Sequence, residues 1–272
     1  VRRDNCGMVR YVVGNVIEKL LIERDSVGAV EFCKGVISEI CQNKIDLAQL
    51  IITKSYSRDA EEYASPQAHV VLAQKMKKRN PATAPVVGDR VPYVIIKGEK
   101  GAKMFSKAED PLFVLEHDIP IDTQYYIDQL IAPLCRIFSP IMEDPETVFR
   151  TGDHTRVLVI PRSKVATGGL ASFLVVREVC MGCRAALKKG EKVVCFDCHD
   201  SLTDIYMKYL ARVREKEMEF QRLWTHCQSC KGSVIEEIHC AANDCQIFYK
   251  RTKVYKELQE SQKSLVKFDI SW

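Results

Sequence analysis

The chain has 272 residues, of which 46% are hydrophobic and 28% charged, proportions that are ordinary for a globular protein of one or two domains. No apolar run in this sequence approaches the ~20 residues that cross a bilayer, and we expect no membrane partner. The formal net charge of +4 is too small to mark a nucleic-acid binder, so any such binding must come from local basic patches. The chain begins with Val1 rather than methionine, and we expect a fragment of a longer protein.

The first 160 residues combine helical periodicity with short β-rich stretches. Asp25, Ser26 and Gly28 predict a break between two early helices. Pro92 predicts a strand start or a sheet edge, because proline cannot donate to a ladder. The elements expected in chain order are two helices within 10–44, a strand at 47–53, a helix at 66–79, a strand at 90–97 and a helix from 122 or 123 to about 138.

The pattern of the sequence changes near Pro161, which indicates a domain boundary. The glycines at 168 and 169 predict a flexible joint there. Apolar residues at helical spacing then predict helices at 200–224 and 248–268, which would form an αα-hairpin. We therefore expect a mainly α fold with minor β (α+β), in which a helical domain precedes a small metal-binding domain. The predicted divisions are a domain at 1–160, a linker at 161–175, a metal module at 176–200 and a helical hairpin with a second cysteine site at 201–272.

Eight of the twelve cysteines form two tetrads in the last hundred residues. The first has the spacing C-x2-C-x11-C-x2-C, which is typical of a zinc ribbon because each two-residue gap lets one turn present two sulfurs to the same ion. Four thiolates close the coordination shell, so we expect a structural zinc site rather than a catalytic one. The predicted ligands are Cys180, Cys183, Cys195 and Cys198.

The second tetrad has the asymmetric spacing C-x2-C-x9-C-x4-C and comprises Cys227, Cys230, Cys240 and Cys245. Four cysteines suit either zinc or an iron–sulfur cluster, and the spacing alone favours zinc without settling the choice. Either centre with four thiolates carries a charge of about −2, so two sites would bring the net charge from +4 to about zero. Such sites also indicate a reducing compartment.

A basic run closes the predicted helix at 66–79, and Arg2 and Arg3 add charge at the start of the chain. The run could contact nucleic-acid phosphates, or it could simply be favourable at a helix C-terminus, and both interpretations stay open at this point. We find no P-loop, no G-x-G-x-x-G, no nucleophile elbow and no close carboxylate pair, so we predict no catalytic residue. The residues of the run are Lys75, Lys77, Lys78 and Arg79.

Segments along the whole chain resemble the delta class of the B-family replicative DNA polymerases. The segments that carry the resemblance are VRRDNC (1–6), QLIITK (49–54), GDRVPYVI (88–95), EDPLFVLEH (109–117), PIDTQYY (120–126), RTGDHTR (150–156), LWTHCQSCKGS (223–233) and DCQIFYKR (244–251). Both tetrads fall where that class places its two metal-binding modules.

The resemblance implies that residues 1–160 are the end of the palm and the thumb, which grips the primer–template duplex. It favours the interpretation that the side chains of the basic run contact the phosphate backbone of the duplex. It also implies zinc at the first tetrad with a role at the sliding clamp (PCNA), and a [4Fe–4S] cluster at the second tetrad with a role in binding the accessory B subunit. The polymerase carboxylates, their magnesium ions and the 3'-5' exonuclease would lie outside this chain, and the nucleus would be its location.

Two alternatives explain part of the same pattern. A stand-alone zinc adaptor would account for the tetrads and the near-neutral charge, but not for the long first domain or the basic run. The tail of the related zeta polymerase is the other alternative, and the stretches FYKRTKV and LWTHC favour the delta class over it.

Overall fold

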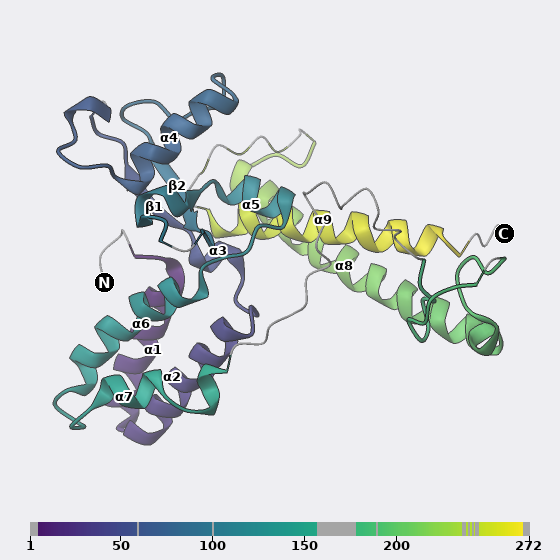
Figure 1. The fold of residues 1–272 in the computed structure, drawn as a ribbon, viewed down its shortest axis with the longest axis horizontal. Coiled ribbons are helices and arrows are strands. Elements are labelled where there is room, and N and C mark those ends of the chain that lie inside the picture. The colour runs from purple at the N-terminus through teal and green to yellow at the C-terminus, as the bar shows by residue number, and fades with distance from the viewer. Residues whose placement is uncertain are drawn as a thin grey trace. The chain divides into compact units, whose positions relative to one another are not determined.

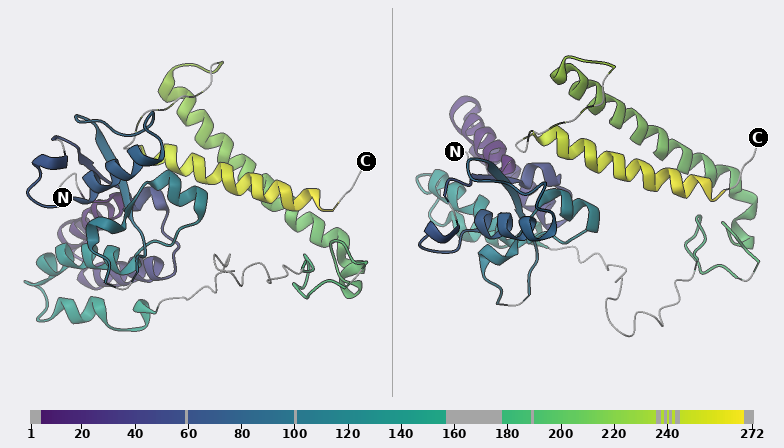
Figure 2. Two further views of the ribbon diagram at one scale, coloured as in Figure 1. Left: turned by 45° about the horizontal axis from the view of Figure 1, so that its top comes forward. Right: turned by 90° about the horizontal axis from the view of Figure 1, so that it is seen from above.

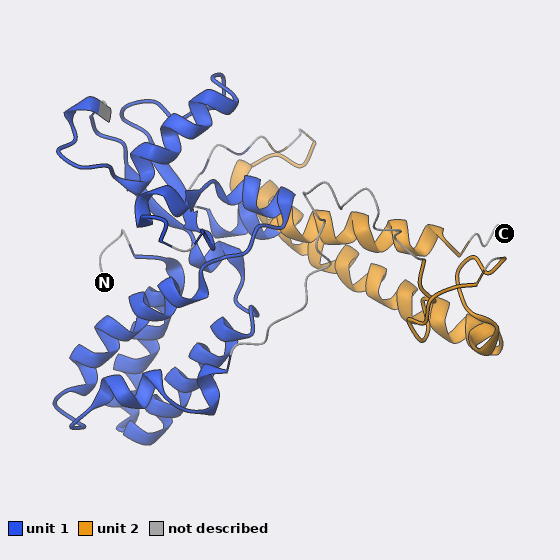
Figure 3. Ribbon diagram, in the orientation of Figure 1, with its two compact units in different colours: residues 1–159, 240–250 blue, residues 160–239, 251–272 orange. Residues whose placement is uncertain are grey.

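The computed structural model describes residues 5–58, 60–99, 101–156, 178–188, 190–235, 238, 240, 242 and 245–268. The chain divides into two compact units (Figure 3). Unit 1 comprises residues 1–159 and 240–250, and unit 2 comprises residues 160–239 and 251–272. The fold is mainly helical with one small sheet, as the sequence predicts.

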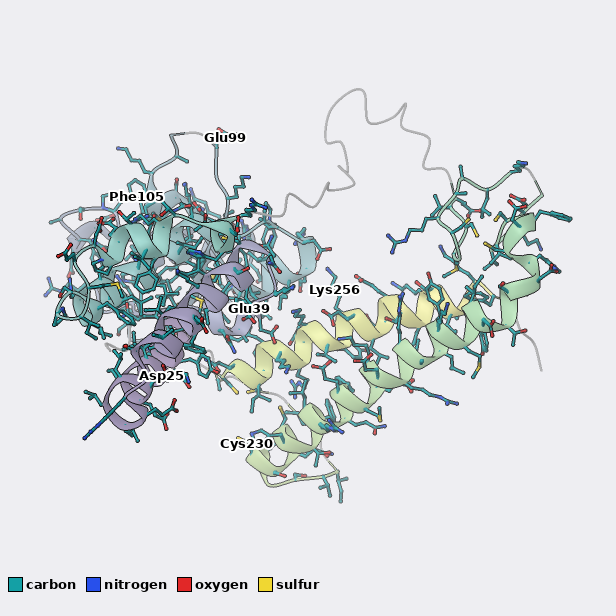
Figure 4. All side chains as sticks on the ribbon, turned by 90° about the horizontal axis from the view of Figure 1, so that it is seen from below. Asp25, Glu39, Glu99, Phe105, Cys230 and Lys256 are labelled. Atoms are coloured by element: carbon teal, nitrogen blue, oxygen red, sulfur yellow. The ribbon has the colours of Figure 1, made fainter. Side chains whose placement is uncertain are left out.

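Four helices of unit 1 pack together on one side of the unit, with α1 and α2 against α6 and α7 (Figure 1). The predicted break between the first two helices is confirmed at Arg24, which adopts a left-handed conformation with φ of 54°. Asp25, labelled in Figure 4, then caps α2 by accepting a hydrogen bond of 2.7 Å from the backbone N–H of Gly28. The helices are α1 (Gly7–Glu18), a π-turn (Lys19–Glu23), α2 (Ser26–Cys41), α6 (Thr123–Phe138) and α7 (Pro145–Arg150).

A three-stranded antiparallel sheet in the order β1-β2-β3 forms the other part of unit 1. Helix α4 (Ala68–Arg79) packs on β2 and β3, and the 3-10 turn Met104–Lys107 packs on α4. The predicted helix at 66–79 is therefore confirmed. The strands are β1 (Ile52–Ser55), β2 (Arg90–Ile95) and β3 (Ala108–Glu109).

The structure corrects two sequence predictions at the sheet. The strand predicted at 47–53 is wrong in its first half, because Leu47–Leu50 forms the short helix α3 and the strand begins only at Ile52. Leucine, alanine and glutamine favour a helix, and β-branched residues start with Ile51. Pro92 lies neither at a strand start nor on an edge strand. It is tolerated because β3 pairs only with Val94 and Ile95, which leaves Pro92 paired on the β1 side alone.

Two short helices that the sequence analysis did not predict begin with the same signal, an aspartate before a proline. Asp110 accepts a hydrogen bond of 3.2 Å from the N–H of Phe113 at the start of α5 (Pro111–His117). Asp144 does the same for Thr147 at the start of α7, again at 3.2 Å. An acidic cap with proline at the first helical position is a local signal for a helix start.

Tyr126 of α6 joins the sheet to the helices in the core of unit 1. Its ring is fully buried, and its hydroxyl accepts a hydrogen bond of 3.0 Å from the N–H of Ile95 in β2. Cys6, Cys33 and Cys41 are buried in the same core. These thiols lie among apolar side chains, where burial raises the pKa of Cys33 to about 12.

A helical pair confirms the predicted αα-hairpin, and most of this pair belongs to unit 2. The pair consists of α8 (Leu202–Lys231) and α9 (Gln246–Val266), of which residues 246–250 belong to unit 1. Within unit 2 the two helices run side by side in Figure 2. Lys216 of α8 contacts Glu257 of α9 at 2.7 Å, and the rings of Phe220 and Tyr255 lie 5.4 Å apart. Within the described residues, no helix combines the length and the apolar character that a membrane crossing requires.

Candidate metal centres and nucleic-acid interface

The first tetrad forms a cluster in unit 2. The sulfur atoms of Cys180, Cys183, Cys195 and Cys198 all lie within 4.8 Å of one another, and they are the only group of at least three potential ligands of this kind among the described residues. The Sγ atoms of Cys183 and Cys195 are 3.6 Å apart. Four sulfurs about 2.3 Å from a zinc ion would have edges of about 3.8 Å, whereas a disulfide needs about 2 Å. The spacing of the sulfurs therefore fits a zinc ion and is longer than a disulfide bond.

Two backbone turns bring these sulfurs together. An antiparallel bridge joins Val179 and Ala186 around the first pair of cysteines, and the second pair opens the 3-10 turn Phe196–Ser201 that leads into α8. Gly182 lies inside the first pair, where an added Cβ would be only 2.7 Å from a side-chain carbon of Ile205 in α8. The metal module is thus packed directly against the start of the long helix.

Hydrogen bonds prepare Cys180 to act as a ligand. Its sulfur accepts bonds of 3.3 Å from the N–H groups of Gly182 and Cys195. Burial raises the pKa of the Cys180 thiol, but the backbone hydrogen bonds outweigh burial and lower this pKa to about 6. The hydrogen bond with Cys195, together with burial, raises the pKa of Cys198 to about 12. Four thiolates therefore need a cation to coexist here, and a zinc ion held by Cys180, Cys183, Cys195 and Cys198 would supply it.

The second tetrad is divided between the two units, so its ligand set stays a prediction. Cys227 is buried in the penultimate turn of α8, and Cys230 is exposed in the last turn, at the end of the helix in Figure 4. Cys240 is exposed, and Cys245 is half-buried immediately before α9. The predicted helix at 200–224 is therefore too short, because α8 continues to Lys231 and carries the first cysteine pair itself.

The basic run lies at the C-terminus of α4, where its four residues have different surroundings. Arg79 forms a two-point ion pair with Glu109 of β3, at 2.7 and 2.9 Å. The Nζ of Lys75 donates hydrogen bonds to the carbonyl groups of Ser106 and Ala108, at 2.8 and 3.2 Å. Two of the four side chains predicted to contact nucleic acid therefore already have partners within the protein.

The other two residues of the run, Lys77 and Lys78, are exposed and contact no acidic group among the described residues. Arg2 and Arg3 lie outside the described residues. Sequence reasoning did not identify Glu109 as the partner of Arg79, and no local pattern could have done so, because the two residues are thirty positions apart. The basic surface that remains free is smaller than the sequence suggests.

Comparison with known proteins supports zinc binding in the second part of the chain. Residues 1–141 match the family described as DNA polymerase family B, and residues 180–251 match the C4-type zinc-finger of DNA polymerase delta. The second match spans both tetrads. Among solved structures, the family B DNA polymerase from Pyrobaculum calidifontis is 28% identical, with 51% of this chain and 18% of that chain covered and a TM-score of 0.44.

The curated relatives of this chain include DNA polymerase delta catalytic subunits from several organisms. The chain is 46% identical to that of Schizosaccharomyces pombe, over 100% of this chain and 25% of the relative. It is 48% identical to that of Bos taurus, over 98% of this chain and 24% of the relative. It spans about a quarter of the length of these relatives. The family model matches just over half of the chain, and delta catalytic subunits match it along its whole length. The chain therefore belongs to DNA polymerase family B.

Proposed function

We propose that this chain is the thumb and metal-binding tail of a replicative DNA polymerase, and that the parent protein is a DNA-directed DNA polymerase with 3'-5' exonuclease activity. The single observation that carries the proposal is the likeness to delta catalytic subunits, which continues without a break from the first domain through both tetrads. That continuity argues against a stand-alone zinc adaptor, which would not need the first domain. The match to the zinc-finger of polymerase delta favours delta over zeta.

Each part of the chain has a proposed task. Residues 1–160 would contribute the palm end and the thumb, 161–175 a linker, 176–200 the zinc module, and 201–272 the hairpin with the second centre. The chain would contribute no catalytic residue, and the magnesium ions of the reaction would be held by the remaining three quarters of the parent protein. Nuclear location follows from a role in replication.

The proposed grip on DNA is sequence-independent and electrostatic. Exposed lysines at the end of α4 would neutralise phosphates and release counterions, so affinity for duplex should fall as salt rises. The test is binding of a labelled primer–template duplex to the chain between 50 and 200 mM salt. Undetectable binding at low salt, or binding that salt does not change, would contradict the thumb assignment.

For the metals, we propose zinc at the first tetrad and a [4Fe–4S] cluster at the second. The compact sulfur cluster supports zinc at the first site. The second tetrad has a different spacing and places two of its sulfurs on the last turns of a helix, so it need not hold the same ion. The cluster itself rests on the resemblance to the delta class.

For the partners, we propose that the zinc module contacts the sliding clamp (PCNA) and that the second module binds the accessory B subunit. Large apolar side chains support docking at both places, because they are exposed without serving a core. Phe196 of the zinc module is 87% exposed, and Ile235, between the pairs of the second tetrad, is 93% exposed.

The B-subunit assignment can be tested with Cys240→Ser. The variant should weaken binding of the purified B subunit in co-purification while keeping the zinc of the first site, because the proposal treats the two tetrads as separate modules. Cys135→Ser, which changes a half-buried cysteine outside both tetrads, serves as the matched control and should bind normally. Loss of both metals together in Cys240→Ser would contradict separate modules.

A further inference from the structure

Two residues of the basic run, Lys75 and Arg79, contact other parts of unit 1, and they lie on one face of α4. Lys75 and Arg79 are four positions apart, so their side chains project from the same side of the helix. Both contact the segment from Ser106 to Glu109, which comprises the end of the 3-10 turn and β3. Lys77 lies about 200° around the helix axis from Lys75 and faces away from these contacts.

Apolar packing weakens toward the end of this helix. Fully buried side chains in α4 stop at Ala73, and Met76 is only partly buried against the core. The last turn is therefore held mainly by polar contacts: the hydrogen bonds of Lys75, the ion pair of Arg79, and the Arg79 guanidinium, whose central carbon lies 4.0 Å from the ring centroid of Phe113 in α5.

The ion pair between Arg79 and Glu109 is costly for a nucleic acid to displace. The Glu109 side chain is 5% exposed and also accepts a hydrogen bond of 3.0 Å from the N–H of Asp110. A phosphate that took Arg79 would leave this buried carboxylate without its cation, which is among the most costly changes in a protein interior. The charge of Arg79 is thus already neutralised within the protein.

We propose that Lys75 and Arg79 are positioning residues which fix the end of α4, and that Lys77 and Lys78 are the side chains of this run that contact the duplex backbone. The proposal rests on the proposed function of the chain as a DNA-gripping thumb. It divides a run of four similar cations into two pairs with different tasks. A direct contact changes how many counterions binding releases, whereas a positioning residue does not.

The test measures the slope of log affinity against log salt for a primer–template duplex, using the full chain. Each phosphate contact in B-form DNA contributes about −0.9 to this slope. Lys77→Gln with Lys78→Gln should make the slope shallower by about 1.8. Lys44→Gln, which removes an exposed cation elsewhere in unit 1, is the matched control and should leave the slope unchanged.

Arg79 is tested by replacing the whole ion pair. Arg79→Gln alone would leave the buried Glu109 carboxylate without a partner and could destabilise the fold. It is therefore combined with Glu109→Gln. The double variant places two amide side chains at the site and keeps the net charge of the protein. The double variant should keep the wild-type slope. Arg79→Lys, which keeps the charge but loses the two-point geometry, should speed amide hydrogen exchange in the last turn of α4.

Two results would overturn the division. A slope that becomes shallower by about 0.9 in the Arg79→Gln, Glu109→Gln variant would make Arg79 a direct contact. An unchanged slope after Lys77→Gln with Lys78→Gln would remove both lysines from the interface. The proposed grip on DNA fails separately, and only if the unaltered chain shows no salt-dependent binding at all.

Discussion

Gly182 shows how a single residue without a side chain couples the zinc module to the helix beneath it. An added methyl group would meet the side chain of Ile205 at 2.7 Å and the sulfur of Cys198 at 3.0 Å. We predict that Gly182→Ala accelerates zinc loss to a chelator, because either the helix or the ligand must shift. Gly35→Ala in α2, where nothing lies within 4 Å of the added carbon, should leave zinc retention unchanged. Equal chelation rates in the two variants would contradict this packing.

His69 of α4 predicts a pH dependence of stability. The ring is 5% exposed, and its Nδ1 has no hydrogen-bond partner among the described residues. Burial, with a smaller contribution from Lys54, lowers the pKa of His69 below its ordinary value of 6.5. The unfolded chain therefore takes up this proton first, and stability should fall as the pH drops below about 6.5.

His69→Phe removes this titration, so the decrease in melting temperature between pH 7 and pH 5 should be smaller in the variant than in the unaltered chain. Thermal unfolding at several pH values measures it. His154→Gln, which alters a half-buried histidine at the surface of unit 1, is a control for histidine loss alone. Parallel pH profiles in the unaltered chain and His69→Phe would rule out the proposed cost of protonating this ring.

At the scale of elements, a buried hydrogen bond between Tyr126 of α6 and Ile95 of β2 helps to join the helical part of unit 1 to its sheet. Tyr126→Phe would leave a buried N–H without its acceptor, which costs about 1–3 kcal/mol of unfolding free energy. Tyr125→Phe changes a neighbouring, half-buried tyrosine and should cost much less. Denaturant unfolding of both variants checks the prediction, and equal losses would show that the hydrogen bond does not matter.

Elements that depend on neighbouring residues could be predicted from the sequence, and elements that depend on distant partners could not. Asp25 and Asp122 cap helices within three residues, so α2 and α6 could be predicted from the sequence. The first tetrad could also be predicted from the sequence, because the spacing of its cysteines indicates that the four sulfurs meet at one point. Strand β3 has two residues and exists only because β2 lies beside it, and the role of Glu109 depends on a helix thirty positions away.

The same contrast applies to the candidate sites. The sequence identifies a run of cations but cannot say which of them are neutralised, because that depends on tertiary contacts. For Lys75 and Arg79 the partners are carbonyl groups and a buried carboxylate from another part of unit 1. The second tetrad could be recognised from its spacing, but its ion could not, because zinc and iron–sulfur clusters accept the same four sulfurs.

On the scale of the whole molecule, the two units differ in what stabilises them. Unit 1 has a large apolar core. The buried apolar side chains of unit 2, apart from cysteines, are few among the described residues: Ile205, Val213, Val254, Leu258 and Phe268. Structural zinc contributes about 10–16 kcal/mol of apparent binding free energy in small zinc domains, which is comparable to the roughly 8–15 kcal/mol from burying five apolar side chains. The metal is therefore a large part of what stabilises unit 2.

We therefore predict that metal removal unfolds unit 2 selectively. Hydrogen exchange measured by mass spectrometry should show loss of protection around residues 178–205 after chelation, with α1, α2 and α6 unchanged. Uniform loss of protection across both units would mean that the metal modules also stabilise the core of unit 1.

The most direct test of the account is the metal content of the anaerobically purified chain, measured by native mass spectrometry with elemental analysis and visible absorption. We predict one zinc and four iron atoms per chain, with broad absorption near ~400 nm from a four-thiolate cluster. Two zinc ions in a colourless protein would contradict the assignment of the second tetrad. Sulfurs without metal, or joined in disulfide pairs, would contradict the account as a whole.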